Sequence, residues 1–262
     1  QWIQRVKRLK RGIDLSRSRR YMDIHTHILP GVDDGSSNMD ETMKMVDIAY
    51  REGIRIIMAT PHYGAWNPGY DKSEAVVACR RVRDRMRGVH PDMNLYIGNE
   101  LYYNPGIVED LKSGKALTLG GTSYALVEFA VDESYKMIYS GLREFIMEGY
   151  RPVIAHIERY RCLQNDIDRV KELVELGAYV QINARSFLSG RADKRSSKRT
   201  SWCVELLQND LVHFIASDCH NCESRSPIME TAVRQMVRFT DKETVYRIVH
   251  TNIIKLMQNE FI

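Results

Sequence analysis

The chain has 262 residues, of which 44% are hydrophobic and 27% are charged, a composition that can bury one large core. It has no run of about 18 apolar residues, so we expect no transmembrane span, and residues 1–20 lack the apolar segment of a secretory signal. The net charge of +4 does not indicate nucleic-acid binding, because residues 1–20 hold eight Lys and Arg and one Asp, which leaves 30 basic and 33 acidic residues in the other 242.

The basic segment at residues 1–21 is interpreted as an extension outside the fold, either disordered or not native to it. Its basic run at residues 7–11 would also suit an anionic membrane surface or nucleic acid. The chain does not begin with Met, whereas Met22 stands immediately before the first predicted strand, which favours the first interpretation. We therefore expect one domain over residues 22–262.

Short β-rich runs alternate with amphipathic stretches along the chain. In chain order, the predicted strands are residues 22–25, 54–60, 95–100, 124–129, 152–156, 179–183 and 212–217. The predicted helices are residues 39–53, 73–88, 105–113, 135–149, 166–177, 198–209, 229–239 and 242–257, with N-caps at Asn38 and Asp241. Residues 62–72 and 189–201 are predicted to be irregular, the second as a solvated basic loop.

Seven strands that alternate with helices predict an α/β fold with a parallel sheet and right-handed crossovers. A closed or nearly closed (β/α)7 barrel of the TIM-like kind fits this pattern best. A doubly wound open sheet remains the alternative, because periodicity does not report whether a sheet closes.

The five cysteines do not indicate a disulfide framework, because they are scattered and odd in number. They are Cys79, Cys162, Cys203, Cys219 and Cys222. We expect reduced thiols in a cytoplasmic protein.

Side chains that can bind a metal gather where the predicted strands end. Six of the seven strands end in such a residue, and an Asp-Asp-Gly turn follows the first strand. The candidates are His25, His27, Asp33 or Asp34, His62, Glu100, Glu128, His156, Asp218 and His220. In a parallel barrel these ends open on one face, where crowded imidazoles and carboxylates are costly unless cations compensate them. Nine such groups suit two or three divalent ions, and mixed nitrogen and oxygen ligands suit Mn²⁺, Fe or Zn²⁺.

Each of these signals has an ordinary structural explanation when it stands alone. A single His-x-His is often a pair of structural histidines, and a buried strand-end Glu is more often ion-paired than metal-bound. Their common position at strand ends favours the metal site, which would activate water and clamp a phosphate or carbonyl oxygen. Arg159 and Arg225 follow two of the candidates by a few residues. Their guanidinium groups would bind phosphoryl oxygens through pairs of N–H donors, and the alternative is that both are ordinary surface arginines.

A cysteine nucleophile is a weaker alternative. Cys219 and Arg225 have the spacing of a cysteine-phosphatase loop, but the five residues between them contain no glycine, and the preceding Asp218 would raise the thiol pKa. Cys219 and Cys222 as a redox or zinc pair lack a second half-site.

The chain resembles the PHP (polymerase and histidinol phosphatase) superfamily, and within it the bacterial manganese-dependent protein tyrosine phosphatases of the CpsB/YwqE type. The stretches MDIHTHILPGVDDG (residues 22–35), IAHIERY (154–160) and IASDCH (215–220) carry this resemblance. It implies a distorted (β/α)7 barrel with three divalent ions, with Mn²⁺ favoured and Fe or Zn²⁺ as alternatives. The ligands it implies are His25, His27, Asp34, His62, Glu100, Glu128, His156, Asp218 and His220.

The resemblance also implies that Arg159 and Arg225 engage the phosphate and that Cys219 is a bystander. The expected reaction is hydrolysis of phosphotyrosine on a protein, with the Tyr-rich tail of a bacterial tyrosine kinase that controls capsular or exopolysaccharide synthesis as the partner. A small-molecule phosphoesterase of the histidinol-phosphate type and a non-catalytic regulatory module are the alternatives. Aromatic residues on the expected rim would contact the phenyl ring or, as the alternative for most of them, serve only the fold; they are Tyr63, Trp66, Tyr102, Tyr103 and Tyr160.

Overall fold

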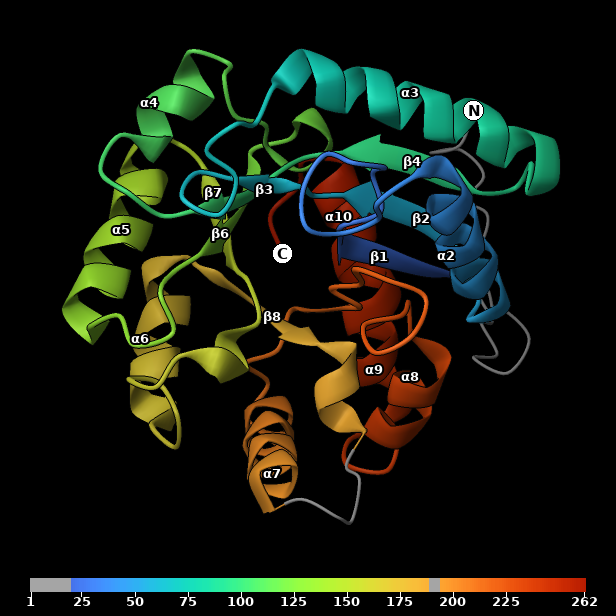
Figure 1. Cartoon of the computed structure of the whole chain (residues 1–262). Helices are drawn as coiled ribbons and strands as arrows, with labels where there is room; N and C mark the ends of the chain where they lie inside the picture. The colour runs from blue at the N-terminus through green and yellow to red at the C-terminus, as the bar shows by residue number, and fades with distance from the viewer. Residues whose placement is uncertain (1–19, 189–193) are drawn as a thin grey trace.

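The computed structural model describes residues 20–188 and 194–262, which form a curled parallel sheet surrounded by helices (Figure 1). The strands are β1 (Tyr21–Thr26), β2 (Ile54–Ala59), β3 (His62–Tyr63), β4 (Asn94–Ile97), β5 (Glu100–Tyr102), β6 (Tyr124–Glu128), β7 (Arg151–Ile154), β8 (Tyr179–Asn183) and β9 (Phe214–Ala216). One sheet has the order β1-β2-β4 and the other the order β3-β5-β6-β7-β8-β9, and neighbouring strands in both sheets pair in parallel.

Backbone hydrogen bonds connect the two sheets at both ends. Gly98 N donates to Ala59 O at 2.8 Å, where β2 and β4 continue into β3 and β5. On the other side, His27 N donates to Cys219 O at 2.9 Å, which joins the end of β1 to the segment after β9. Because β2 continues into β3 and β4 into β5, the nine strands occupy seven positions around one barrel-like sheet. This arrangement confirms the predicted fold class.

Helices cover the outside of the sheet (Figure 1). They are α2 (Met39–Arg51), α3 (Lys72–Val89), α4 (Ile107–Lys112), α5 (Tyr135–Met147), α6 (Ile167–Leu176), α7 (Lys194–Gln208), α8 (Glu230–Met236), α9 (Lys242–Tyr246) and α10 (Asn252–Met257). The π-helical turn η5 (Arg247–Thr251) joins α9 to α10. The predicted caps are confirmed, since Asn38 accepts from Glu41 N and Asp241 from Thr244 N.

The inside of the barrel changes from apolar to polar along the strands. Side chains alternate across a strand, so Tyr124, Leu126 and Glu128 of β6 share one face. The first two belong to an inner apolar cluster that also contains Ile253 and Leu256 of α10. α10 therefore helps to fill the interior, and the polar residues are left at the carboxyl ends of the strands.

Three predicted segments were wrong. Residues 62–72 were predicted to be irregular, but His62 and Tyr63 form the short strand β3. The predicted strand at residues 95–100 is broken between β4 and β5, because the buried Asn99 side chain donates to Pro61 O and accepts from Leu117 N. The predicted loop at residues 189–201 is helical from Lys194 onward, where α7 begins, and its first five residues lie outside the described ranges.

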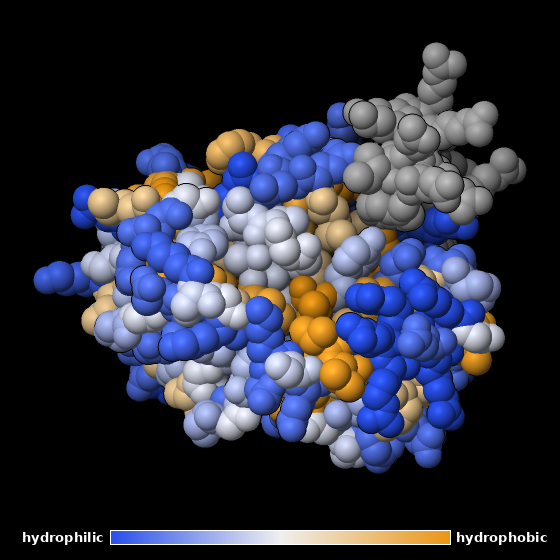
Figure 2. Space-filling model, turned by 90° about the horizontal axis from the view of Figure 1, so that it is seen from above, coloured by the Kyte–Doolittle hydropathy of each residue, from blue (hydrophilic) through white to orange (hydrophobic). Residues whose placement is uncertain are grey.

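Residues 1–19 of the predicted extension also lie outside the described ranges, and Tyr21 already belongs to β1. Within those ranges, no helix is both long and apolar enough to cross a membrane. The face seen from above is covered mainly by hydrophilic side chains, with hydrophobic residues gathered in small patches (Figure 2).

Candidate metal centre

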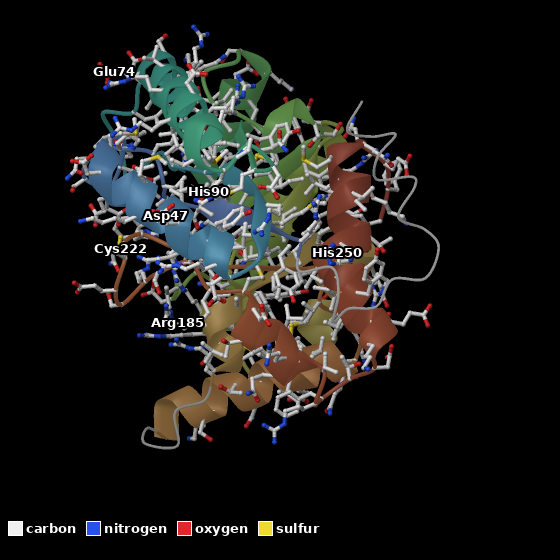
Figure 3. All side chains as sticks on the ribbon, turned by 90° about the vertical axis from the view of Figure 1, so that its right-hand side faces the viewer. Asp47, Glu74, His90, Arg185, Cys222 and His250 are labelled. Carbon is white, nitrogen blue, oxygen red and sulfur yellow. The ribbon has the colours of Figure 1, made fainter. Side chains whose placement is uncertain are left out.

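The structure brings the nine predicted side chains together at the carboxyl ends of the strands. All except Asp34 belong to residues that are buried. Five of the eight histidines of the chain lie in this cluster, whereas His90, His213 and His250 lie elsewhere. His90 instead pairs with Asp47 at 2.7 Å between helices α3 and α2, and Figure 3 shows both on the outside of the sheet.

Glu100, at the start of β5, is the centre of the cluster. Its Oε2 lies 3.1 Å from Nε2 of His25, Nε2 of His27 and Nδ1 of His62. Its Oε1 lies 2.8 Å from Nε2 of His156. One buried carboxylate thus faces imidazoles from the end of β1, from β3 and from the turn after β7.

A second group of donors lies beside the first. Asp34 Oδ1 is 3.5 Å from Nε2 of both His62 and His220. Asp218 Oδ1 is 3.5 Å from Nε2 of both His25 and His27. Glu128, at the end of β6, brings Oε1 to 3.4 Å from Nε2 of His156.

The donor set fits divalent metal ions. Bonds of about 2.0–2.2 Å place neighbouring donors of one ion roughly 3.0–3.5 Å apart, the range of the separations above. Three subsets have ligand atoms within 4.8 Å of one another: His27, Asp34, His62 and His220; His25, His27 and Glu100; and His62, Glu100 and Glu128. Glu128 Oε2, His156 Nδ1 and His220 Nε2 are buried and form no hydrogen bond with the described residues. Such atoms need a partner, and a cation supplies one.

The pKa values of the buried carboxyl groups also favour a bound cation. Burial, followed by the charge of Glu100, raises the pKa of Glu128 to about 9. Burial also acts to raise the pKa of Glu100, but His25, His156 and His27 together hold it well below its usual range. Glu128 therefore keeps a proton at neutral pH unless further positive charge compensates it, as a divalent ion would.

The turn after β1 separates the roles of its two aspartates. Asp33 Oδ2 lies 2.7 Å from Nδ1 of His27 and accepts from His62 N at 3.0 Å, which leaves the Nε2 of His27 for the cluster. Asp34 is exposed and reaches the cluster from above the turn. The structure therefore places Asp34, and not Asp33, among the donors. Gly35 closes the turn because its backbone lies against His27, where a Cβ would be 2.0 Å from the carbonyl oxygen.

Both predicted arginines contact the cluster through the same carboxylate. Arg159 Nη2 donates to Asp218 Oδ2 at 2.5 Å, and Arg225 Nη2 donates to Asp218 Oδ1 at 2.8 Å. Arg159 lies in the 3-10 turn η3 (Ile157–Arg159), which begins directly after His156. Their side chains remain 31% and 38% exposed, so both guanidinium groups reach the solvent beside the donors.

Cys219 does not have the surroundings of a nucleophile. Its side chain is buried in the outer hydrophobic core, and burial followed by the charge of Asp23 raises the pKa of its thiol. Cys222 donates its Sγ–H to Glu41 O, and all five cysteines are free.

The rim aromatics divide into two kinds. Tyr160 is fully buried and accepts a hydrogen bond from Phe129 N, so the expectation that it reaches a phenyl ring was wrong. Trp66 is 62% exposed and lies edge-to-face with Tyr102 at 5.4 Å. Trp66 is therefore the most exposed member of this set, and Tyr63, Tyr102 and Tyr103 are half-buried.

Two buried amides contact the cluster without having been predicted. Gln181 and Asn183 lie on β8 and contact His25 and Asp218, respectively. Neither residue carries a charge or a motif that would single it out in the sequence, and only their alternate positions on a predicted strand signal that they share a face.

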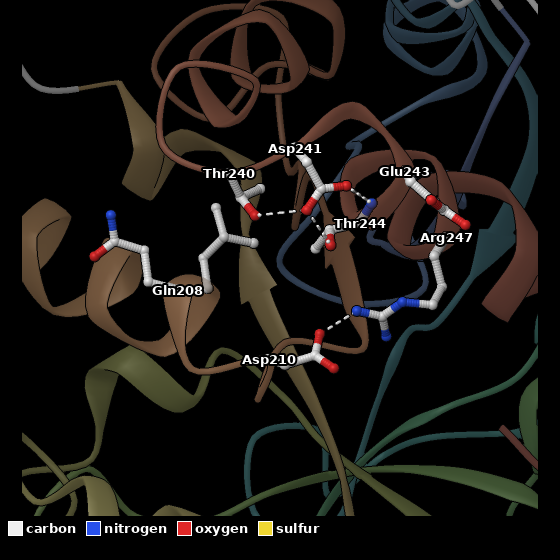
Figure 4. Close-up of a pocket in the computed structure, with 8 residues that line it drawn as sticks. Gln208, Asp210, Thr240, Asp241, Glu243, Thr244 and Arg247 are labelled. Atoms are coloured by element: carbon white, nitrogen blue, oxygen red, sulfur yellow. Dashed lines mark hydrogen bonds and ion pairs between the residues drawn. The ribbon is translucent and has the colours of Figure 1, made fainter.

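A shallow pocket of about 440 Å³ lies apart from this cluster, between α7 and α9 (Figure 4). Its polar residues pair with one another: Asp210 with Arg247, and Asp241 with Thr240 and Thr244. None of its lining residues belongs to the donor cluster.

Known proteins resemble this chain over most of its length. Residues 21–258 match the family model described as capsular polysaccharide synthesis, CpsB/CapC. The tyrosine-protein phosphatase CpsB of Streptococcus agalactiae is 35% identical over 247 residues, which cover 92% of this chain and 100% of that protein. The tyrosine-protein phosphatase YwqE of Bacillus subtilis is 33% identical over 245 residues, which cover 92% and 93%.

Solved structures show the same fold. A crystal structure from work on YwqE of Bacillus subtilis and CpsB of Streptococcus pneumoniae, described as unique metal-dependent tyrosine phosphatases, superposes with a TM-score of 0.82. It is 30% identical, and the match covers 92% of this chain and 96% of that one. The phosphotriesterase homology protein of Escherichia coli, with a TM-score of 0.56 and 13% identity over 91% of this chain and 97% of its own, shares the barrel architecture alone.

Proposed function

Because this chain belongs to the CpsB/CapC capsular polysaccharide synthesis family and is a metal-dependent tyrosine-protein phosphatase, we propose that it hydrolyses phosphotyrosine at the donor cluster around Glu100. The observation that carries the proposal is the convergence of nine donors with two partly exposed guanidinium groups on one face of the barrel.

We assign the metal ligands to the nine side chains of the cluster. They are His25, His27, Asp34, His62, Glu100, Glu128, His156, Asp218 and His220. Three divalent ions would share them, since nine donors exceed what one ion accepts and seven of them already fall into three overlapping subsets. Mn²⁺ is favoured, with Fe or Zn²⁺ as alternatives. When bound, the ions supply Lewis acidity and an activated water molecule.

In this proposal the two arginines bind the phosphoryl group of the substrate. Arg159 and Arg225 each hold Asp218 through one N–H and have further N–H donors, so each can also donate to phosphoryl oxygens. Charge that develops on those oxygens during hydrolysis is thereby stabilised. Trp66, exposed at the rim, offers an apolar surface to the phenyl ring.

The proposed substrate is the Tyr-rich tail of a bacterial tyrosine kinase that controls capsular or exopolysaccharide synthesis. Support comes from the family's description and from the relatives, which are named as tyrosine-protein phosphatases. We place the reaction in the cytoplasm, in keeping with five free cysteines.

Turnover of phosphotyrosine peptides and of histidinol phosphate by the Mn²⁺-loaded protein tests this function. We expect a large kcat/KM preference for the peptides and loss of turnover in His25→Ala. A preference for histidinol phosphate would instead identify a small-molecule phosphoesterase. Absence of phosphate release from either substrate would favour a binding module.

A further inference from the structure

Strand β8 supplies no metal-ligand candidate, yet it carries two buried amide side chains that touch the candidates of its neighbours. We propose that Gln181 and Asn183 form a relay that positions the metal ligands at the ends of β1, β7 and β9. The proposal rests on the metal site of the proposed function and adds two positioning residues to it.

Gln181 determines which nitrogen of His25 faces the cluster. Its Oε1 lies 3.1 Å from Nδ1 of His25. Gln181 Nε2 donates to Asn183 Oδ1 at 2.9 Å, which orients the amide so that its oxygen faces the histidine. A carbonyl oxygen only accepts, so the proton of His25 must lie on Nδ1. When a metal ion is bound, the lone pair is then on Nε2, the atom that lies among the other donors, 3.1 Å from Glu100 Oε2.

The same relay holds two ligand candidates whose backbones are in an unusual conformation. His156 has φ +32° and Asp218 has φ +51°, both in the left-handed region that residues with a Cβ seldom adopt. Gln181 Oε1 accepts from the backbone N of His156 at 2.9 Å. Asn183 Nδ2 donates to Asp218 Oδ2 at 2.8 Å. The backbone of His156 and the carboxylate of Asp218 are thus both held from β8, the strand that lies between β7 and β9.

Burial and charge explain why amides suit this place. Gln181 is 0% exposed and Asn183 is 7% exposed, so water does not compete for their hydrogen bonds. An amide both accepts and donates, which lets one chain of bonds run from His25 through Gln181 and Asn183 to Asp218. It does so without adding a further negative charge to a site that is already rich in carboxylates.

A titration of the metal-free full chain with Mn²⁺ alone tests the relay. The EPR signal of free Mn²⁺ reports how much of the metal is unbound and so gives the Kd. We expect Gln181→Leu and Asn183→Ala to weaken Mn²⁺ binding by roughly 10–100-fold, the usual effect of removing a partner that orients a ligand. Gln181→Glu keeps both accepted hydrogen bonds and should recover part of the affinity.

Asn252→Ala is the matched control, because Asn252 on α10 is also a buried amide and its side chain donates to His213 O at 2.9 Å, away from the metal-ligand candidates. This variant should lose stability but keep the wild-type Kd for Mn²⁺. In the protein loaded with diamagnetic Zn²⁺, nitrogen-resolved NMR should show the His25 proton on Nδ1, and Gln181→Leu should remove that preference.

Two results would overturn the relay. One is a Kd for Mn²⁺ in Gln181→Leu and Asn183→Ala equal to that of Asn252→Ala, and the other is a His25 proton on Nε2 in the wild type. If the wild type binds Mn²⁺ and the variants are unaffected, the relay alone fails. If the wild type does not bind Mn²⁺, the metal site of the proposed function fails with it.

Discussion

Arg159 Nη2 lies 2.5 Å from Asp218 Oδ2, although 59 positions of the chain separate the two residues. The contact anchors the guanidinium group to a carboxylate of the cluster. Its other N–H groups remain beside the candidate metal ligands. An anchored guanidinium loses little freedom when a phosphate arrives, which suits a group that stabilises charge in the transition state.

Replacement of Arg159 should therefore affect turnover more than folding. We expect Arg159→Ala to lower kcat by roughly 10²-fold, as removal of single charge-stabilising donors does elsewhere. Arg159→Lys should be intermediate, because it keeps the charge but loses the fork. Steady-state kinetics on a phosphotyrosine peptide measure both. Arg169→Ala is the control, since Arg169 binds Cys162 O and Asp166 on the surface of α6. Equal kinetics for Arg159→Ala and this control would contradict the role.

Removal of the metal should abolish the reaction reversibly. Burial and the charge of Glu100 raise the pKa of Glu128 to about 9. The positive groups of the protein alone therefore do not balance the negative charge of its buried carboxylates. We expect full loss of phosphatase activity after chelation and dialysis, and recovery when Mn²⁺ is added. Metal analysis of the active protein should then report about three ions per chain, by the ligand count of the proposed site. Activity that persists in chelator would refute the metal-dependent mechanism.

Cys219 should be dispensable for the same reaction. Its thiol is buried, and burial raises its pKa, so no thiolate is available at neutral pH. We expect Cys219→Ser to retain most of its kcat, with some loss of stability from a hydroxyl placed in the core. A phosphate-release assay beside a thermal melt separates the two effects. A variant that folds normally but is inactive would restore the cysteine alternative.

Much of the site could be predicted because strand position carries the information. His25, Glu128 and Asp218 each end a predicted strand, and parallel strands bring their ends to one face whatever their separation in sequence. The choice between Asp33 and Asp34 is different. It depends on the path of a turn, which no periodicity encodes, and the family motif alone pointed to Asp34.

The errors arose where tertiary contacts override local preference. Residues 95–100 read as one strand, but the side chain of Asn99 binds backbone groups of two distant segments and breaks it. The basic, Ser-rich stretch before Trp202 reads as a loop, yet α7 begins at Lys194. Buried Thr200, which donates to Ser186 O, and Trp202 tie that helix to the core.

Gly35 should tolerate no side chain. A Cβ at this position would lie 2.0 Å from His27 O and 2.5 Å from His27 Cβ, so the turn that carries Asp33 and Asp34 would have to move. We expect Gly35→Ala to destabilise the fold by about 1–3 kcal/mol, the usual cost of overpacking, and to weaken Mn²⁺ binding. Urea unfolding and a metal titration measure the two losses.

Gly88→Ala provides the matched control, because a Cβ on this residue of α3 meets nothing within 4 Å. A helical Gly replaced by Ala should gain up to about 1 kcal/mol and leave metal binding unchanged. If Gly35→Ala behaved like Gly88→Ala, the close approach at His27 would be disproved.

His250 should make stability depend on pH. It is buried in η5 between the rings of Tyr21 and Tyr246, and burial lowers its pKa from 6.5 to about 4. Figure 3 shows it beside the C-terminal helices. Between these two values the unfolded chain binds a proton that the folded chain does not, so stability rises with pH in this window. As pH falls from about 6.5 to about 4, this residue should remove up to about 3 kcal/mol of stability.

His250→Phe isolates that contribution, because the ring still packs against both tyrosines but no longer titrates. Urea unfolding in chelator at several pH values, which removes metal-linked protons from the comparison, should give a smaller loss of stability below pH 6.5 for the variant than for the wild type. Above that pH the two curves should run parallel, since a neutral His in both states adds no slope. Curves that stay parallel down to about pH 4 would mean that His250 takes up its proton in the folded protein as readily as in the unfolded chain, and that its buried, unpaired Nε2 is accessible to water after all.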